Sequence, residues 1–161
     1  MKKIVSLILA LVMMMSLSTV AFANLEADGA TGDVEVSYGV AAGFSVTIPD
    51  DIALSGELGN LAGAGVVTVV AGSKILPTET LTVKVSSANT WKLKNVEEIA
   101  YTLKVDNGEA FTEKEDNLVL TASAAEVNTG KTATLAFACT ATAFAYSGEY
   151  TDTLTFTVDV A

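Results

Sequence analysis

The alternation of residue types in residues 148–160 constrains the fold more than any other feature of the chain. The segment reads Gly-Glu-Tyr-Thr-Asp-Thr-Leu-Thr-Phe-Thr-Val-Asp-Val, so threonine stands at most of the positions between larger side chains. A period of two in β-branched and aromatic residues is typical of a strand that is buried on one face only. The segment therefore predicts a sheet strand with a core face and a solvent face.

Similar patterns run through most of the chain. Further strands are predicted at residues 34–40, 44–48, 81–87, 91–94, 101–105, 118–120 and 131–144. The continuous apolar run 66–70 predicts a strand that is buried on both faces, whereas residues 50–65 show no firm period and predict an irregular loop. The alanine-rich residues 122–125 suit a short helical turn. About eight or nine short strands predict an all-β, antiparallel, immunoglobulin-like β-sandwich, formed as one domain by residues 24–161.

The N-terminal residues have the three parts of a secretory signal peptide. These parts are the positive residues Lys2 and Lys3, the apolar run 4–20, and the small residues Ala21 and Ala23 around Phe22. Cleavage is predicted before Asn24, which makes residues 1–23 the signal peptide. The alternative is a membrane-spanning anchor, but the run is at the short end for crossing a bilayer and a cleavage site follows it. The chain is predicted to be secreted and extracellular.

The composition argues against several classes of function. The chain contains no arginine and no histidine, and without Lys2 and Lys3 its net charge of −10 becomes −12. An acidic chain is poorly suited to bind nucleic acid or an anionic membrane. Without histidine, neither a Ser-His-Asp triad nor a zinc site of the usual kind can form. Cys139 is the only cysteine, so it has no partner for an internal disulfide, and burial as a small hydrophobe is expected.

The acidic residues do not form a recognisable catalytic pair. Adjacent carboxylates such as Asp50 and Asp51 diverge in extended backbone, so we expect no enzymatic activity and no cofactor. Two loops offer oxygen ligands of the kind that calcium prefers, although neither has the EF-hand pattern. These ligands are Asp106, Asn107 and Glu109 in one loop, and Glu113, Glu115, Asp116 and Asn117 in the next. Solvated acidic loops are the simpler interpretation.

Trp91 is the only tryptophan, and it belongs to a Trp-Lys-Leu sequence that ends at Leu93. Two roles suit it. The ring can be part of the core of the sandwich, or it can be an aromatic platform for a sugar ring, since tryptophan combines an apolar face with a polar N–H.

Two segments together resemble the WxL domains of Gram-positive cell-surface proteins. The first is residues 86–93 with their Trp-x-Leu, and the second is residues 146–158, which are similar to the closing Tyr-x-x-x-Leu-Thr-Trp-x-Leu of those domains. In the second segment Phe156 replaces the tryptophan and Val158 replaces the leucine. The resemblance implies a secreted sandwich held non-covalently on peptidoglycan, with Trp91, Leu93, Phe156 and Val158 as the motif residues. The C-terminal segment is also similar to spore-coat-U-type pilin domains, which polymerise.

Two hypotheses of function follow. In the first, the protein associates non-covalently with peptidoglycan or another glycan of a Gram-positive cell wall, alone or with other surface proteins. In the second, it is a structural subunit that assembles with copies of itself into a fibre, pilus or coat, when an extended segment joins the sheet edge of a neighbour. The polar residues 24–32 and the threonine-rich final strand suit the second hypothesis.

Overall fold

The computed structural model describes residues 37–161. The predicted signal peptide at 1–23, its cleavage residues Ala21, Ala23 and Asn24, and residues 24–36 lie outside the described residues.

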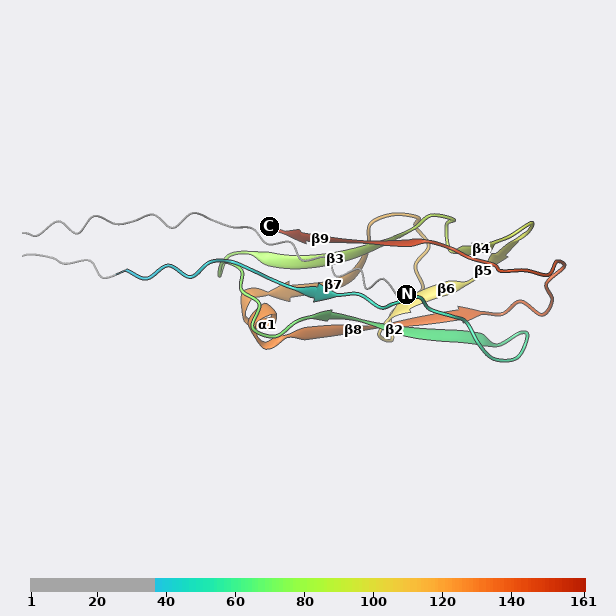
Figure 1. The fold of residues 1–161 in the computed structure, drawn as a ribbon, viewed down its shortest axis with the longest axis horizontal. Helices are drawn as coiled ribbons and strands as arrows, with labels where there is room; N and C mark the ends of the chain where they lie inside the picture. Colours follow the sequence, from blue (N-terminus) through green and yellow to red (C-terminus); the bar gives the residue numbers. More distant parts are fainter. Residues whose placement is uncertain (1–36) are drawn as a thin grey trace, which may run out of the picture.

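The described chain is all-β and antiparallel, and it forms a sandwich of two layers (Figure 1). One layer is a four-stranded sheet in the order β1 (Val46–Thr47), β2 (Leu61–Val69), β8 (Lys131–Cys139) and β6 (Thr102–Val105). The other is a three-stranded sheet in the order β7 (Asn117–Ser123), β3 (Thr80–Ser87) and β9 (Leu154–Val160). A small hairpin of β4 (Lys92–Lys94) and β5 (Glu98–Ala100) and a short helix, α1 (Ala124–Thr129), complete it. The predicted fold class is thus confirmed; the immunoglobulin-like arrangement and the strand count stay predictions.

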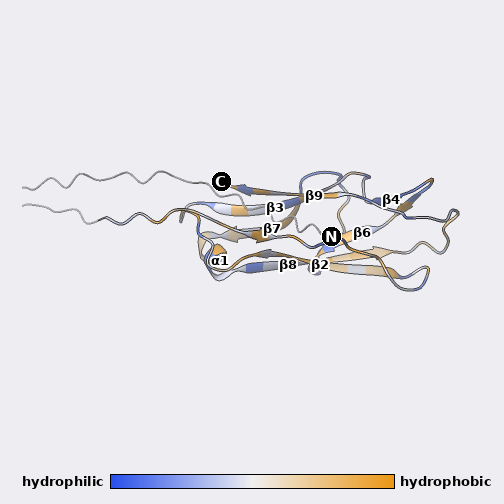
Figure 2. Cartoon of the chain, in the orientation of Figure 1, coloured by the Kyte–Doolittle hydropathy of each residue, from blue (hydrophilic) through white to orange (hydrophobic). Residues whose placement is uncertain are grey.

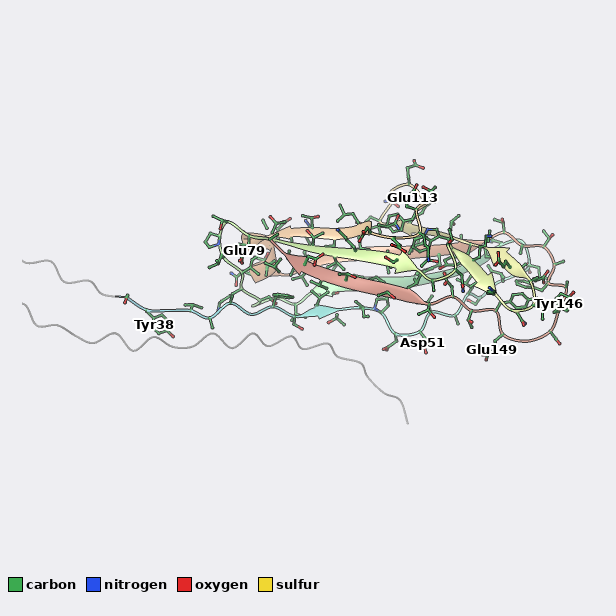
Figure 3. All side chains as sticks on the ribbon, turned by 90° about the horizontal axis from the view of Figure 1, so that it is seen from above. Tyr38, Asp51, Glu79, Glu113, Tyr146 and Glu149 are labelled. Carbon is green, nitrogen blue, oxygen red and sulfur yellow. The ribbon has the colours of Figure 1, made fainter. Side chains whose placement is uncertain are left out.

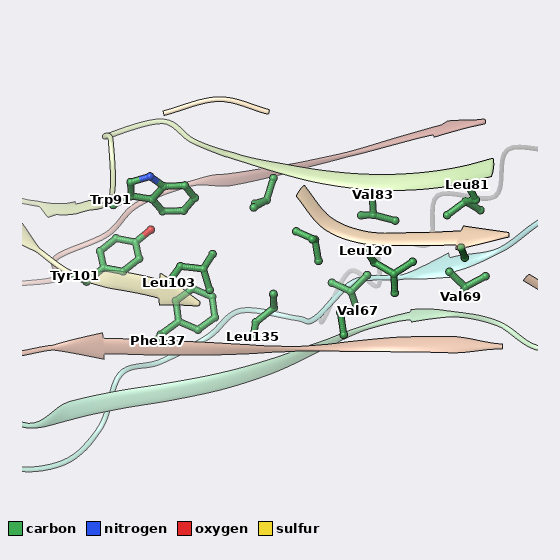
Figure 4. Close-up of a cluster of buried hydrophobic side chains, with 14 of the residues drawn as sticks. Val67, Val69, Leu81, Val83, Trp91, Tyr101, Leu103, Leu120, Leu135 and Phe137 are labelled. Atoms are coloured by element: carbon green, nitrogen blue, oxygen red, sulfur yellow. The ribbon is translucent and has the colours of Figure 1, made fainter. Parts of the chain in front are cut away.

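The core lies between the two layers, where buried apolar side chains from strands of both sheets meet (Figure 4). Figure 2 shows hydrophobic residues in the strands of both layers. On β3 the inward residues Leu81, Val83 and Val85 are completely buried. They face the inward residues of β8 and β6, among them Leu135 and Leu103, which are equally buried. Cys139 is buried at the end of β8 as a free thiol, as its sequence context predicted. The period of two therefore gives the inward face of these strands correctly.

The prediction of an irregular loop at residues 50–65 is wrong at its end, because β2 begins at Leu61. Two inward positions of β2 are the glycines Gly63 and Gly65, so the sequence shows no alternation of apolar and polar residues there. A Cβ added at either glycine would lie 2.9 Å from a side-chain carbon of Ile52. The glycines therefore make room for the segment before β2, which packs against the inward face of the strand.

The strand over residues 66–70 is buried on one face only, which corrects the prediction of burial on both. Val67 and Val69 are fully buried, but Val66 is 47% exposed and Val70 is 39% exposed. The strand belongs to an antiparallel sheet whose second face is solvated, so a continuous apolar run here does not mean two buried faces.

A β-bulge changes which side chains of β7 face the core. The pairing of β7 with β3 shifts so that Val83 is opposite Leu120 and the next residue, Lys84, is opposite Leu118. As a result Leu118 is exposed while Val119 and Leu120 are buried. A regular strand would have placed Leu118 and Leu120 on one face; the extra residue of the bulge breaks that period.

The N-terminal part of the described chain has less strand than predicted. Residues 37–40 form no strand although their sequence alternates, and the strand predicted at 44–48 is reduced to β1. The segment is attached to the sandwich at Gly43, whose N–H donates to the carbonyl oxygen of Lys74 at 2.8 Å. Before that point the chain runs outward, and Tyr38 is 91% exposed.

The short helical turn predicted at residues 122–125 lies further along the chain, because Ala122 and Ser123 belong to β7 and α1 begins at Ala124. The Glu126 carboxylate accepts hydrogen bonds from the Ser123 backbone N–H at 2.9 Å and from the Lys131 ammonium at 2.7 Å. The contact with Lys131, followed by those with Ser123, lowers the pKa of Glu126 from its ordinary 4.5 to about 2. The glutamate thereby joins the helix N-terminus to the start of β8.

We predict that Glu126 contributes to the pH dependence of stability. A carboxylate whose pKa is depressed on folding stabilises the fold above its unfolded pKa, and that contribution is lost as the pH falls from about 4.5 towards 2. Urea unfolding midpoints of the wild type should therefore fall across this range, and those of Glu126→Gln should fall less. Glu109→Gln, at an exposed loop position, removes the same charge and should follow the wild type. Parallel curves for the wild type and Glu126→Gln would contradict the assignment.

Candidate functional site

Trp91 lies in the turn between β3 and β4, and its indole ring is part of the core (Figure 4). The side chain is 5% exposed, and its ring centroid is 6.2 Å from that of Tyr101 and 5.7 Å from that of Phe111. Its Nε1–H donates to the carbonyl oxygen of Glu113 at 2.7 Å. Of the two roles that suited Trp91 in the sequence, the core position is the one found. The ring does not present a face to solvent.

The turn that carries Trp91 has an uncommon backbone. Thr90 and Trp91 have φ values of 55° and 58°, in the left-handed region that side chains with a Cβ seldom adopt. Such a conformation costs about 1–3 kcal/mol per residue and persists only where surrounding contacts hold it. The turn therefore needs specific hydrogen bonds, and these come from a carboxylate that lies far away in the sequence.

That carboxylate belongs to Asp152, which precedes β9. Its Oδ2 accepts hydrogen bonds from the hydroxyls of Ser87 at 2.6 Å and Tyr101 at 2.7 Å. Its Oδ1 accepts from the backbone N–H groups of Asn89 at 3.0 Å and Thr153 at 2.8 Å. The same Ser87 hydroxyl oxygen accepts from the Trp91 N–H at 2.7 Å. The carboxylate thus connects the Trp91 turn, β3 and the C-terminal segment in one hydrogen-bonded group.

The Tyr101 hydroxyl is protonated and acts in this group as a donor at neutral pH. Burial first, and then its hydrogen bond to the carboxylate of Asp152, raise the pKa of Tyr101 far above its ordinary value. Ionisation would place a phenolate against a carboxylate away from water, which both effects oppose.

The structure brings the two WxL-like segments side by side. Ser87 is opposite Leu154 in the β3–β9 ladder, and further on Lys94 and Thr151 exchange backbone hydrogen bonds of 2.8 and 3.1 Å. The remaining motif residues, Leu93, Phe156 and Val158, are half-buried and pack against the core. All four motif residues are therefore turned inward.

An aromatic loop at the same end of the sandwich was missed by the sequence analysis. We define it as residues 144–150; it contains Phe144, Tyr146 and Tyr150. The rings of Phe144 and Tyr150 meet edge to face with centroids 4.9 Å apart, and Tyr146 is 51% exposed. Figure 3 shows Tyr146 at one end of the molecule and Tyr38 at the other. The sequence feature that could have revealed this loop is the occurrence of three aromatic residues within seven positions.

The aromatic loop is held by Glu97, which lies in the turn between β4 and β5. The Glu97 carboxylate accepts hydrogen bonds from the Tyr150 hydroxyl at 2.6 Å and from the Ala145 N–H at 2.7 Å. These two contacts, the first being the larger, lower the pKa of Glu97. A fixed carboxylate, an amide at Asn95 and an exposed tyrosine ring thus lie together on this loop end. Such a set can contact both the apolar faces and the hydroxyls of a sugar.

The acidic loops considered for calcium are placed differently. The Asp106 carboxylate accepts a hydrogen bond from the Thr134 N–H at 2.9 Å, and the Asn117 amide donates to the carbonyl oxygen of Glu113 at 2.8 Å. Within residues 37–161, no three or more His, Cys, Asp and Glu side chains gather where they could hold a metal ion. No helix in that same range is long and apolar enough to cross a membrane.

Comparison with known proteins identifies no family. No protein-family model matches the sequence, and none of the curated proteins matches it either.

We predict that Trp91→Ala mainly destabilises the fold. Loss of a buried tryptophan costs about 3–5 kcal/mol in free energy of unfolding, because a cavity remains where the ring was. Trp91→Phe keeps part of the ring contact and should cost less. Denaturant unfolding followed by circular dichroism measures both variants. A Trp91→Ala protein with wild-type stability would contradict the core position of the ring.

We also predict that Asp152→Asn destabilises the Trp91 turn. An asparagine replaces one acceptor oxygen by an NH₂ group, which then faces other donors. The expected loss in free energy of unfolding is about 2–3 kcal/mol. Asp159→Asn is the matched control: it lies on the exposed face of β9 and should change stability by less than about 0.5 kcal/mol. Equal losses in the two variants would show that the hydrogen-bonded group around Asp152 is not important for folding.

Proposed function

We propose that this protein is a non-enzymatic, secreted surface protein that associates non-covalently with a Gram-positive cell wall, through peptidoglycan or another wall glycan. The observation that carries the proposal is the aromatic loop, where Tyr146 is exposed between Ala145, whose N–H donates to the Glu97 carboxylate, and Ser147, whose carbonyl oxygen accepts from the Asn95 amide. The resemblance of two segments to WxL domains supports the same class of protein. The ligand class remains a proposal from chemistry.

In this proposal the WxL-like residues have a structural role. Trp91, Leu93, Phe156 and Val158 pack inward, and the Asp152 carboxylate joins their two segments. The Lys94–Thr151 backbone pair then fixes the end of the sandwich next to the aromatic loop. The glycan would contact Tyr146, which is at the surface, rather than the indole of Trp91.

The test is sedimentation of the purified mature protein with isolated Gram-positive cell walls. We expect wild-type protein to pellet with walls, and Tyr146→Ala to bind about threefold to tenfold more weakly, since an aromatic contact is worth about 0.5–1.5 kcal/mol. Tyr38→Ala is the control, because it removes another exposed tyrosine from the opposite end, and all proteins are compared at a concentration at which they are monomeric. Wild-type protein that stays in solution overturns the proposal; equal binding by the two variants overturns the assignment of the aromatic loop.

A second candidate function is a structural subunit that assembles with copies of itself. The observation that favours it is β9, a strand of seven residues that, among residues 37–161, pairs only with β3 and so leaves one edge open. Open edges of this kind are the usual places where an extended segment joins a sheet.

A further inference from the structure

The free edge of β9 differs from the other edges of the two layers of the sandwich, which are β1, β6 and β7. Edges are normally protected by short strands, bulges, lysines, prolines or covering segments. β1 has only two residues, and β7 contains a bulge and has the Lys131 ammonium bound to its Thr121 carbonyl oxygen at 2.7 Å. Residues 110 and 111 cover β6, where the Phe111 N–H donates to the carbonyl oxygen of Leu103 at 2.9 Å. β9 has none of these features.

The inward side chains of β9 are also incompletely covered. Leu154, Phe156, Val158 and Val160 are half-buried, whereas the inward residues of the adjacent strand β3 are completely buried. The difference arises because β3 has a neighbouring strand on both sides and β9 has one. A further strand beside β9 would cover these four apolar side chains and bond the outward backbone groups of the edge.

The sequence contains a segment with the right pattern, and its described part belongs to no strand of the sandwich. Residues 33–40 read Asp-Val-Glu-Val-Ser-Tyr-Gly-Val, so bulky apolar residues occupy every second position over a length close to that of β9. In the described part of this segment, Tyr38 and Val40 are 91% and 62% exposed, and neither belongs to a strand. Such exposed alternating residues are suited to pairing with a sheet that is itself apolar on one face.

The direction of the segment points to a second copy rather than to its own β9. From Gly43 towards Tyr38 the chain runs past the end of the sandwich at which β9 finishes, and Tyr38 lies beyond that end (Figures 1 and 3). Going from N- to C-terminus, residues 37–42 run towards the sandwich, while β9 runs the opposite way (Figure 1). Consider a second copy in the same orientation, shifted along the long axis so that its β9 lies beside this segment. The segment would then be antiparallel to the β9 of that copy, as neighbouring strands are throughout both sheets.

We infer that residues 33–40 of one molecule add as an antiparallel strand to the free edge of β9 in a second copy of this chain. This inference rests on the second candidate function above. Because the donated segment and the accepting edge are different surfaces, each molecule can donate and accept at once, and the contact is repeated without closing. Such head-to-tail contacts build a linear filament.

The test compares two lysine variants with equal net charge. In an added strand, Tyr38 faces the core of the neighbour while Ser37 faces solvent, because successive side chains alternate. In sedimentation velocity over a series of concentrations, wild type and Ser37→Lys should form a concentration-dependent series of oligomers. Tyr38→Lys should remain monomeric at concentrations at least about tenfold higher, since a lysine would be buried against the apolar side chains of β9.

A synthetic peptide of residues 33–40 gives an independent result. It should occupy the edge of β9, shorten the wild-type oligomers, and restrict exchange of the β9 amide hydrogens. If wild type assembles but Ser37→Lys and Tyr38→Lys assemble alike, self-assembly stands and the assigned segment is wrong. If wild type is monomeric at every concentration, both the inference and the second candidate function fail. Pairing of residues 33–40 with β9 of the same molecule would give this result.

Discussion

Packing of the three-stranded sheet on the four-stranded sheet is the interaction on which this structure depends. The single cysteine, Cys139, is a free buried thiol, so no disulfide connects the layers, and cohesion comes from apolar side chains that alternate inward along both sheets. β3 is central to this packing because β7 and β9 flank it, and its inward residues Leu81, Val83 and Val85 lose all contact with water. A core assembled from such alternating positions tolerates glycines such as Gly63 and Gly65 only because a neighbouring segment fills the space they leave.

The carboxylate of Asp152 adds specificity to that packing. Four donors converge on its two oxygens, two of them hydroxyls and two backbone N–H groups, so the charge is well satisfied although the residue is partly buried. The strained turn at Thr90 and Trp91 exists because this group holds it. The two segments that resemble WxL domains are thus joined physically, because the Asp152 carboxylate of the C-terminal segment bonds Ser87 and Asn89 of the segment that carries Trp91.

The two ends of the sandwich have different chemical character. One end presents the aromatic loop, with the exposed Tyr146 and the hydrogen-bonded pair of Tyr150 and Glu97, and this is the end proposed to contact a glycan. The other end releases the N-terminal segment that contains Tyr38, next to the finish of the unprotected strand β9. The two proposed functions, wall association and self-assembly, therefore involve separate surfaces and are compatible in one molecule. A surface protein that both binds a glycan and extends into a filament would place its attachment and its growth on different parts of the same fold.

The sequence by itself determined the fold class, the inward faces of β3, β8 and β9, and the burial of Cys139, because each depends on a local period of two. It could not determine where β2 begins, since glycines interrupt the pattern, or the face of Leu118, since a bulge depends on the partner strand. The contacts between Asp152 and Ser87, and between Glu97 and Tyr150, join residues more than fifty positions apart. Only the tertiary structure decided these, because hydrogen bonds between distant residues follow from how the layers pack and leave no periodic signal in the chain.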